Sequence, residues 1–262
     1  MKETSMSCGP DFDSQKFPSP QPSEYPPVIK PGFFRVNRFT LPTFVDVFIR
    51  RRRNKSGTVS VVVVIPGGVR KIGDGAFHGC TGLISVVIPD SVTGIEGFAF
   101  SGCTGLTSVV IPGGVRKIGD GAFHGCTGLI SVVIPDSVTG IEGFAFSGCT
   151  GLTSVVIPGG VRKIGDGAFH GCTGLTSVVI PDSVTEIGCG AFRGCIGLTS
   201  VVIPDSVTEI GWNAFSGCVG LTSIEILDGV TSIGRSAFYG CNLPESVKKE
   251  LAVKFGSCIF DK

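Results

Sequence analysis

The apolar residues of this chain recur with a period of 23 residues. In the unit that begins at Leu106, LTSVVIPGGVRKIGDGAFHGCTG, apolar side chains occupy unit positions 1, 4, 6, 10, 13, 17, 18 and 21. Neither the two-residue alternation of a strand nor the 3.6-residue period of a helix holds across the whole unit. A fixed period of this length predicts a solenoid, in which each coil of chain buries its apolar side chains against the next coil.

Each unit contains one segment that favours a short strand. Residues 106–111 are rich in β-branched side chains, and the segment ends at Pro112, which cannot donate a hydrogen bond to a neighbouring strand. The glycines that follow permit tight turns that bring the chain back along the coil. We therefore expect a β-rich repeat solenoid with one short parallel strand in each 23-residue repeat.

Eight cysteines occupy the same position in eight successive units: Cys80, Cys103, Cys126, Cys149, Cys172, Cys195, Cys218 and Cys241. A thiol buried between coils behaves as a small hydrophobic side chain, so we interpret this cysteine column as part of the core. A column of reduced thiols also favours a reducing compartment.

A second period of 46 residues is superimposed, because residues 67–112 and 113–158 are identical. Copying alone therefore accounts for His78, His124 and His170, whose predicted separation of about 10 Å is too large for them to share one metal ion. The sequence contains neither a phosphate-binding Gly-Lys-Ser/Thr motif nor a G-x-S-x-G nucleophile motif. We expect no enzymatic activity, no metal site and no cofactor.

The repeats resemble those of a known family, the BspA-like or Treponema pallidum-type leucine-rich repeats. The family pattern L-x-x-[IV]-x-I-P-x-x-V-x-x-I-x-x-x-A-F-x-x-C is similar to residues 106–126, 129–149, 152–172, 175–195 and 198–218. The resemblance implies a right-handed leucine-rich-repeat solenoid of a kind often found on cell surfaces in adhesion or ligand binding. It brings no catalytic residues to this chain.

Composition along the chain predicts four regions. Residues 1–32 form a Pro-rich, disordered leader, and residues 33–57 form a Phe-rich N-terminal cap followed by a basic hinge. Residues 58–241 form the array of about eight repeats. Residues 242–262 form a capping helix and tail, because Val247, Leu251 and Phe255 are spaced four residues apart and Gly256 can end a helix.

The overall composition excludes a function that depends on net charge. The 262 residues are 42% apolar, and 22 basic against 21 acidic side chains leave a net charge of only +1. No apolar stretch approaches the roughly 20 residues of a membrane span, and the first thirty residues lack a secretory hydrophobic run. We expect an intracellular protein, cytoplasmic with a nuclear location open, while the family resemblance leaves the cell surface open.

One dense run of positive charge is formed by Arg50, Arg51, Arg52, Arg53 and Lys55. Such a run can be a nuclear-import signal or bind a polyanion, and it can equally be a solvated hinge between the cap and the array. Apart from this run, nucleic acid is not an expected partner.

Strand alternation indicates where a partner would bind. Positions 1, 4 and 6 point inward, so positions 3 and 5 must project from the opposite face. The predicted binding residues are Ser108, Val110, Ser131, Val133, Ser154, Val156, Ser177, Val179, Ser200 and Val202. The leading hypothesis is a non-catalytic interaction module that binds another macromolecule, first of all a protein, through this face. The alternatives are a passive spacer whose length changes by copying of repeats and a surface adhesin-like protein; the exposed valines can also simply favour the strand conformation.

Overall fold

The computed structural model describes residues 48–53 and 59–262. The expected leader at residues 1–32 lies outside the described residues, as does most of the expected cap and hinge at residues 33–57, including Lys55. The repeat array and the C-terminal region are described continuously from Val59 to Lys262.

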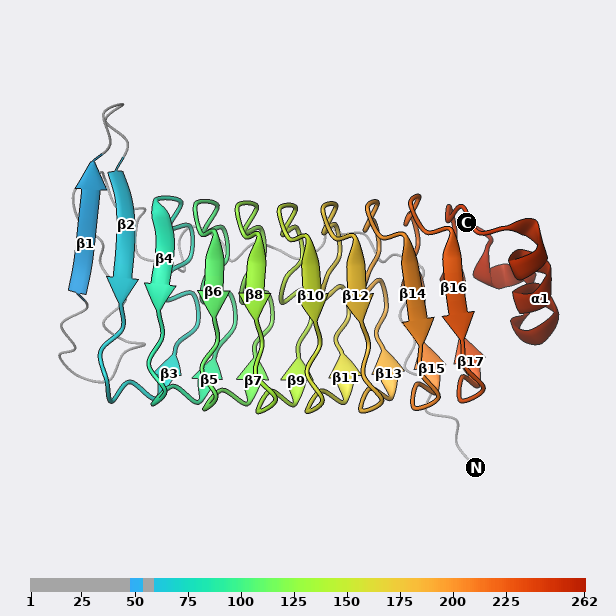
Figure 1. The fold of residues 1–262 in the computed structure, drawn as a ribbon, viewed down its shortest axis with the longest axis horizontal. Helices are drawn as coiled ribbons and strands as arrows, with labels where there is room; N and C mark the ends of the chain where they lie inside the picture. Colours follow the sequence, from blue (N-terminus) through green and yellow to red (C-terminus); the bar gives the residue numbers. More distant parts are fainter. Residues whose placement is uncertain (1–47, 54–58) are drawn as a thin grey trace. The chain divides into compact units, whose positions relative to one another are not determined.

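The repeats stack as a β-solenoid, which confirms the predicted fold. Nine strands of the described residues stand side by side along one side of the stack (Figure 1). They are β1 (Phe48–Arg53), β2 (Val59–Val64), β4 (Leu83–Val87), β6 (Ser108–Val110), β8 (Ser131–Val133), β10 (Ser154–Val156), β12 (Ser177–Val179), β14 (Ser200–Ile203) and β16 (Ser223–Ile226). Parallel pairing joins β2, β4, β6 and β8, then β10 and β12, then β14 and β16, and Ser108 lies opposite Ser131. A residue therefore faces its equivalent in the next repeat, 23 residues later.

A second row of strands runs along another side of the solenoid. These strands are β3 (Lys71–Ile72), β5 (Gly94–Ile95), β7 (Lys117–Ile118), β9 (Gly140–Ile141), β11 (Lys163–Ile164), β13 (Glu186–Ile187), β15 (Glu209–Ile210) and β17 (Ser232–Ile233), and they form one parallel sheet. The sequence pattern predicts one strand per repeat, whereas the structure has two. Two residues are too few to show an alternating pattern, so only backbone pairing between coils reveals these strands.

The third side of each coil consists of turns, yet it is also hydrogen-bonded to the next coil. The backbone N–H of Phe77 donates to the carbonyl oxygen of Ala99 at 2.7 Å, and the N–H of Gly79 donates to that of Ser101 at 2.7 Å. The intervening N–H of His78 donates within its own coil, to Gly75. Because three sides carry such ladders, each coil depends on its neighbours for its backbone hydrogen bonds.

Columns of equivalent residues fill the interior. The phenylalanines at unit position 18 stack from Phe77 to Phe238, with ring centroids 5.1 to 5.6 Å apart and planes within 9° of each other. The Leu, Val and Ile side chains at positions 1, 4 and 6 are buried in every repeat from Leu83 to Ile203, as alternation predicted. Full burial of one such side chain stabilises a fold by about 1.5 to 3 kcal/mol, so repetition of these columns supplies the main driving force.

At the N-terminal end of the described array, β1 pairs with β2 in the antiparallel direction. Arg50 lies opposite Val62 and Arg53 opposite Val59, so the arginine run forms most of a paired strand where a hinge was expected. Backbone pairing with β2 does not depend on side-chain type, and charged residues are well tolerated in a strand at the edge of a sheet. The expected role of this run as an import or polyanion-binding segment stays a prediction.

The expected C-terminal helix is present as α1 (Glu245–Phe255). Leu251 is buried, and Gly256 follows with φ of 87°, its N–H donating to the carbonyl oxygen of Ala252. This positive φ explains why a glycine stands at the end of the helix.

The last residues close the turn side of the final coil, a feature that the sequence pattern does not indicate. These residues include the short 3₁₀ helix η1 (Ser257–Ile259). The carbonyl oxygens of Cys258 and Ile259 accept hydrogen bonds from the N–H groups of Ser236 and Phe238, respectively, each at 2.9 Å. The ring of Phe260 lies 6.3 Å from that of Phe238 and ends the phenylalanine stack. The chain thus replaces the missing next coil with a short segment of its own.

Candidate functional site

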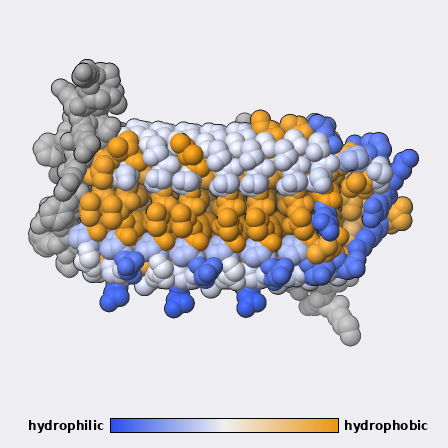
Figure 2. Space-filling view, in the orientation of Figure 1, coloured by the Kyte–Doolittle hydropathy of each residue, from blue (hydrophilic) through white to orange (hydrophobic). Residues whose placement is uncertain are grey.

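The predicted binding residues come together on one exposed surface. The serines and valines at positions 3 and 5 of β4 to β14 project outward while the valines between them are buried. We call this surface the valine face and its outermost apolar line the valine row, formed by Val87, Val110, Val133, Val156, Val179 and Val202. Figure 2 shows an almost continuous apolar band on this side of the solenoid.

The valine row is unusually exposed for a line of apolar side chains. Its six members are 51 to 66% exposed, whereas the valines at position 4 of the same strands are at most 9% exposed. Parallel strands lie about 4.8 Å apart, so six valines in register make a row about 24 Å long. The row ends in β16, where the exposed residue at position 5 is Glu225.

Polar residues border the valine row on both sides. On one side the serines of position 3 follow the same strands about 7 Å away. On the other side, two residues after the position 6 side chain, an exposed aspartate is present in most coils, and glycine replaces it at Gly113 and Gly159. These aspartates are Asp90, Asp136, Asp182, Asp205 and Asp228. The predicted binding residues did not include these aspartates; the signal in the sequence is their recurrence at unit position 8, which glycine occupies in the coils of Val110 and Val156.

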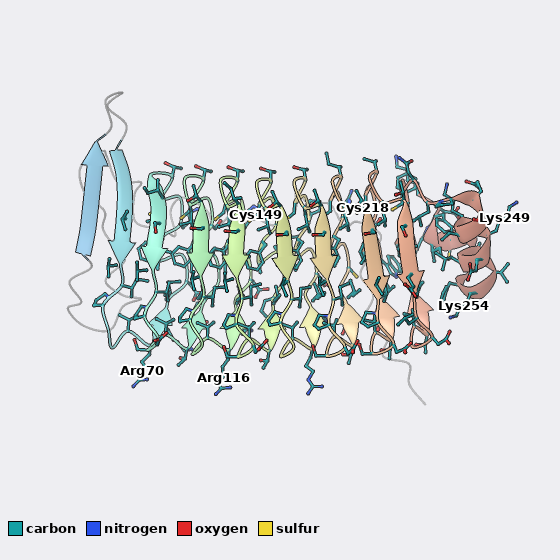
Figure 3. All side chains as sticks on the ribbon, in the orientation of Figure 1. Arg70, Arg116, Cys149, Cys218, Lys249 and Lys254 are labelled. Carbon is teal, nitrogen blue, oxygen red and sulfur yellow. The ribbon has the colours of Figure 1, made fainter. Side chains whose placement is uncertain are left out.

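Lysines and glutamates pair across neighbouring coils at the two-residue strands. Lys71 lies 2.9 Å from Glu96, Lys117 lies 3.2 Å from Glu142, and Lys163 pairs with Glu186. These pairs are solvent-exposed, so each contributes about 0 to 1 kcal/mol. Figure 3 shows Arg70 and Arg116 pointing away from this edge of the solenoid, on the far side of the short strands from the valine face.

The cysteine column is buried from Cys103 to Cys241, as expected, and Cys80 at its N-terminal end is half-buried. Each thiol from Cys103 to Cys241 donates to the carbonyl oxygen of the phenylalanine in the preceding coil, at 3.1 to 3.2 Å. Burial raises the pKa of Cys80 to about 11 and that of Cys126 to about 12, and it raises the pKa of Cys149 well above its ordinary value. These thiols therefore stay protonated and cannot act as nucleophiles at neutral pH.

The three histidines lie in one column on alternate coils. Burial lowers the pKa of each, and the neighbouring histidine lowers it further at His124. At His170 the charge of Arg193 and that of His124 add to the effect of burial, and Nδ1 of this ring lies 3.5 Å from the hydroxyl oxygen of Ser147. Within residues 48–53 and 59–262, no three His, Cys, Asp or Glu side chains gather in a way that could hold a metal ion.

The fold and its surface define a class of protein: a leucine-rich-repeat solenoid that presents one exposed strand face along its length. The sequence model of the BspA type Leucine rich repeat region family matches residues 58–176 and 162–262, in six copies. The chain belongs to this family.

Three solved structures are similar to this chain. A leucine-rich repeat protein from Bacteroides ovatus is 31% identical over 78% of this chain, with a TM-score of 0.68, and this chain spans 60% of its length. The Treponema pallidum leucine-rich repeat protein is 29% identical over 79% of this chain and 92% of its own, with a TM-score of 0.56. A leucine rich cell surface protein from Faecalibacterium prausnitzii is 29% identical over 83% of this chain and 81% of its own, with a TM-score of 0.58.

No curated protein matches the chain. Among the described helices, none combines the length and the apolar character that crossing a bilayer requires.

Proposed function

We propose that this chain is a non-catalytic interaction module that binds a protein partner through the valine face. The observation that carries the proposal is the valine row, in which six apolar side chains in register are more than half exposed. A contiguous apolar surface of this kind is a common feature of interaction sites. Membership of the leucine-rich-repeat family supports the same function.

The chemistry of the other columns supports a module without catalysis. The buried thiols are held in the protonated form, and the histidines of the described chain lie in one column apart from the valine face. A nucleophile paired with a base, which acyl or phosphoryl transfer would need, is not formed by these two columns.

We place the module inside the cell as part of this proposal. The eight cysteines of the column are free thiols, which suits a compartment that keeps thiols reduced, whereas Cys189 outside the column is disulfide-bonded. The cell-surface location printed for the Faecalibacterium prausnitzii protein is that protein's own.

The proposal is tested by placing charge in the middle of the valine row. Val133→Lys, Val156→Lys and Val179→Lys, made together, leave the buried side chains of β8, β10 and β12 untouched, so the array should still fold. Proteins crosslinked to the parent chain in cells should be lost from this variant, because three ammonium groups at the centre of an apolar contact oppose its desolvation.

A matched control adds the same three charges elsewhere. Thr104, Thr127 and Thr150 lie on exposed turns of successive coils, just before the strands. The variant with all three replaced by lysine should retain every partner. If the valine variant folds normally and also retains every partner, the valine face is not the binding surface. The structure would then be better explained as a spacer whose length is set by the number of repeats.

A further inference from the structure

We infer that the valine face accepts an amphipathic α-helix that lies along the solenoid axis, with its apolar stripe on the valine row and basic side chains toward the aspartates. This inference rests on the proposed function and specifies the partner's chemistry. It follows from the width of the row, its spacing and the charges that border it.

The valine row is one side chain wide. Serines border it on one side. On the other side lie the strand-ending prolines, which are followed by aspartate in four of the six coils and by glycine in the other two. A second sheet or another broad apolar surface would place much of its own apolar area on these polar residues. A partner that fits must therefore present a single narrow apolar line, as an amphipathic helix does.

The spacing of the row favours a helix over an extended chain. Neighbouring valines are about 4.8 Å apart, since they lie on adjacent parallel strands. A helix with two apolar residues in every seven repeats its stripe at about 5.2 Å, so its side chains and the valines drift by only about 2 Å over the whole row. An extended chain repeats its same-face side chains at about 6.8 Å and loses register at once. The length of the row, about 24 Å, corresponds to a helix of about 16 residues.

The charges beside the row specify the polar flank of that helix. Asp90, Asp136 and Asp182 are exposed directly after the prolines, and the serine side carries no charge. Three residues after the aspartate position, alternate coils of the N-terminal part carry an arginine: Arg70, Arg116 and Arg162. From β12 onward every coil carries a threonine at this place. The three C-terminal repeats, residues 175–241, contain six acidic and two basic side chains. Lysine or arginine on one flank of the helix would meet complementary charge there, and an acidic flank would be repelled.

The test uses two synthetic helical peptides of 18 residues, stapled to hold the helix. Both carry leucine at heptad positions a and d; the flank beside the stripe is lysine in one and glutamate in the other. By fluorescence anisotropy with the full chain at about 0.05 M salt, the lysine peptide should bind at least tenfold more tightly than the glutamate peptide. Equal affinities, or tighter binding of the glutamate peptide, would overturn the inference.

Variants locate the bound peptide. Asp136→Asn with Asp182→Asn should weaken binding of the lysine peptide about three- to tenfold, since two bordering charges are lost. The matched control, Glu250→Gln with Asp261→Asn, removes two exposed carboxylates from the C-terminal region and should leave binding unchanged. The lysine triple variant of the valine row should reduce binding more than tenfold; unchanged binding would show that the peptide sits elsewhere and would overturn the inference.

Failure of this inference differs from failure of the proposed function. If the cellular partners depend on the valine row while neither helical peptide does, the face binds proteins of another shape and only the inference is overturned. If an extended peptide of alternating valine and lysine binds more tightly than the helical lysine peptide, the inference is likewise overturned and the proposed function is not. If neither the partners nor the peptides depend on the valine row, both the inference and the proposed function are overturned.

Discussion

Phe98 and Gly121 fill a single space between two neighbouring coils. Phe98 has φ of 52°, a value that a non-glycine residue adopts only at a cost of about 1 kcal/mol. A Cβ atom built on Gly121 would lie 2.5 Å from Cε1 of the Phe98 ring. The ring therefore occupies the place of the missing side chain at Gly121, and Phe144 stands over Gly167 in the same way. A large ring on one coil therefore packs where the next coil has a glycine.

The histidine column should make the free energy of unfolding fall in acid. Because burial lowers the pKa of His78, His124 and His170 in the folded state, the unfolded chain binds more protons near pH 6. The free energy of unfolding should hold steady above the unfolded pKa of about 6.5 and fall as pH drops below it. Urea unfolding at pH 7.5, 6.5 and 5.5 measures this change. Serine occupies the same unit position in the intervening coils, as Ser101 and Ser147. Replacing all three histidines with serine should therefore remove the fall in the free energy of unfolding below about pH 6.5.

The cysteine column makes the opposite limb of the same profile. Folded thiols whose pKa is raised stay protonated, while unfolded thiols ionise above their ordinary value near 9. The free energy of unfolding should therefore also decline above about pH 9. The assignment to the histidines would be contradicted if the free energy of unfolding of the parent chain did not fall in acid. It would also be contradicted if the serine variant showed an equal fall.

At the scale of elements, the packing unit is a pair of coils. Within residues 67–174, coils with lysine in the short strand and glycine at position 16 alternate with coils that carry glutamate at position 14 and phenylalanine at position 16, as Lys71, Glu96 and Phe98 show. The identical segments 67–112 and 113–158 each span one such pair. The 46-residue period thus has a physical meaning, because two copied coils carry both halves of each contact.

Deletions of one coil and of two coils should behave differently. Removing residues 113–158 joins Pro112 to Gly159 and recreates an existing interface, so the shortened chain should unfold cooperatively. Removing only residues 113–135 sets Phe144 directly after Phe98, where the ring leaves no room for a side chain. Such overpacking costs about 1 to 3 kcal/mol. Urea unfolding of both variants, followed by circular dichroism, measures the outcome.

A substitution at Phe98 separates crowding from simple shortening. Phe98→Gly should stabilise the single-coil deletion, because it clears the space for Phe144. In the full-length chain the same substitution should destabilise by about 1 kcal/mol, because the half-buried ring is lost. The same sign of effect in both chains would show that the two rings do not compete.

The sequence predicted those elements whose side chains carry a periodic signal. The strands from β4 to β14, their exposed valines and α1 follow from alternation or from four-residue spacing, as at Leu251. The two-residue strands and the closing segment at Cys258 and Ile259 escaped prediction, because they form through backbone hydrogen bonds between coils. The complementarity of Phe98 and Gly121 was hidden too, since a shared space between coils appears only in three dimensions.

At the scale of the whole array, the two ends are closed in different ways. The N-terminal strand β1 reverses direction, so the described array does not begin with a parallel strand that another array could extend. At the other end, the segment from Ser257 to Phe260 takes up the N–H groups and ring face of the last coil. Such closures oppose the end-to-end association to which regular β-solenoids are prone.

The charge of β1 should contribute to this closure. Replacing Arg50 to Arg53 with threonine keeps strand-forming residues opposite Val59 to Val62, so the melting temperature should change by only a few degrees. Loss of four positive charges from β1, the outermost strand of the described array, should increase self-association, measured by sedimentation velocity at several protein concentrations. The location of the same variant in cells, fused to a fluorescent protein, tests the predicted import role.

A large fall in melting temperature with no self-association would show that the arginines stabilise the fold instead of protecting its edge. Substituting Lys248, Lys249 and Lys254 with threonine provides a control, because it also removes positive charge from an end of the array. That variant should self-associate no more than the parent chain, since α1 is a helix and offers no strand edge.

The ladders on three sides also determine how the molecule would respond to tension. If the array is pulled from β2 and from the C-terminus, the force runs along the solenoid axis and opens the hydrogen bonds between coils one row at a time. Because each coil touches only its neighbours, coils should peel away singly, and each 23-residue coil would release about 80 Å of extended chain. Nearly identical coils would yield at nearly equal force, so the array would lengthen in even steps and limit the load that reaches whatever it joins.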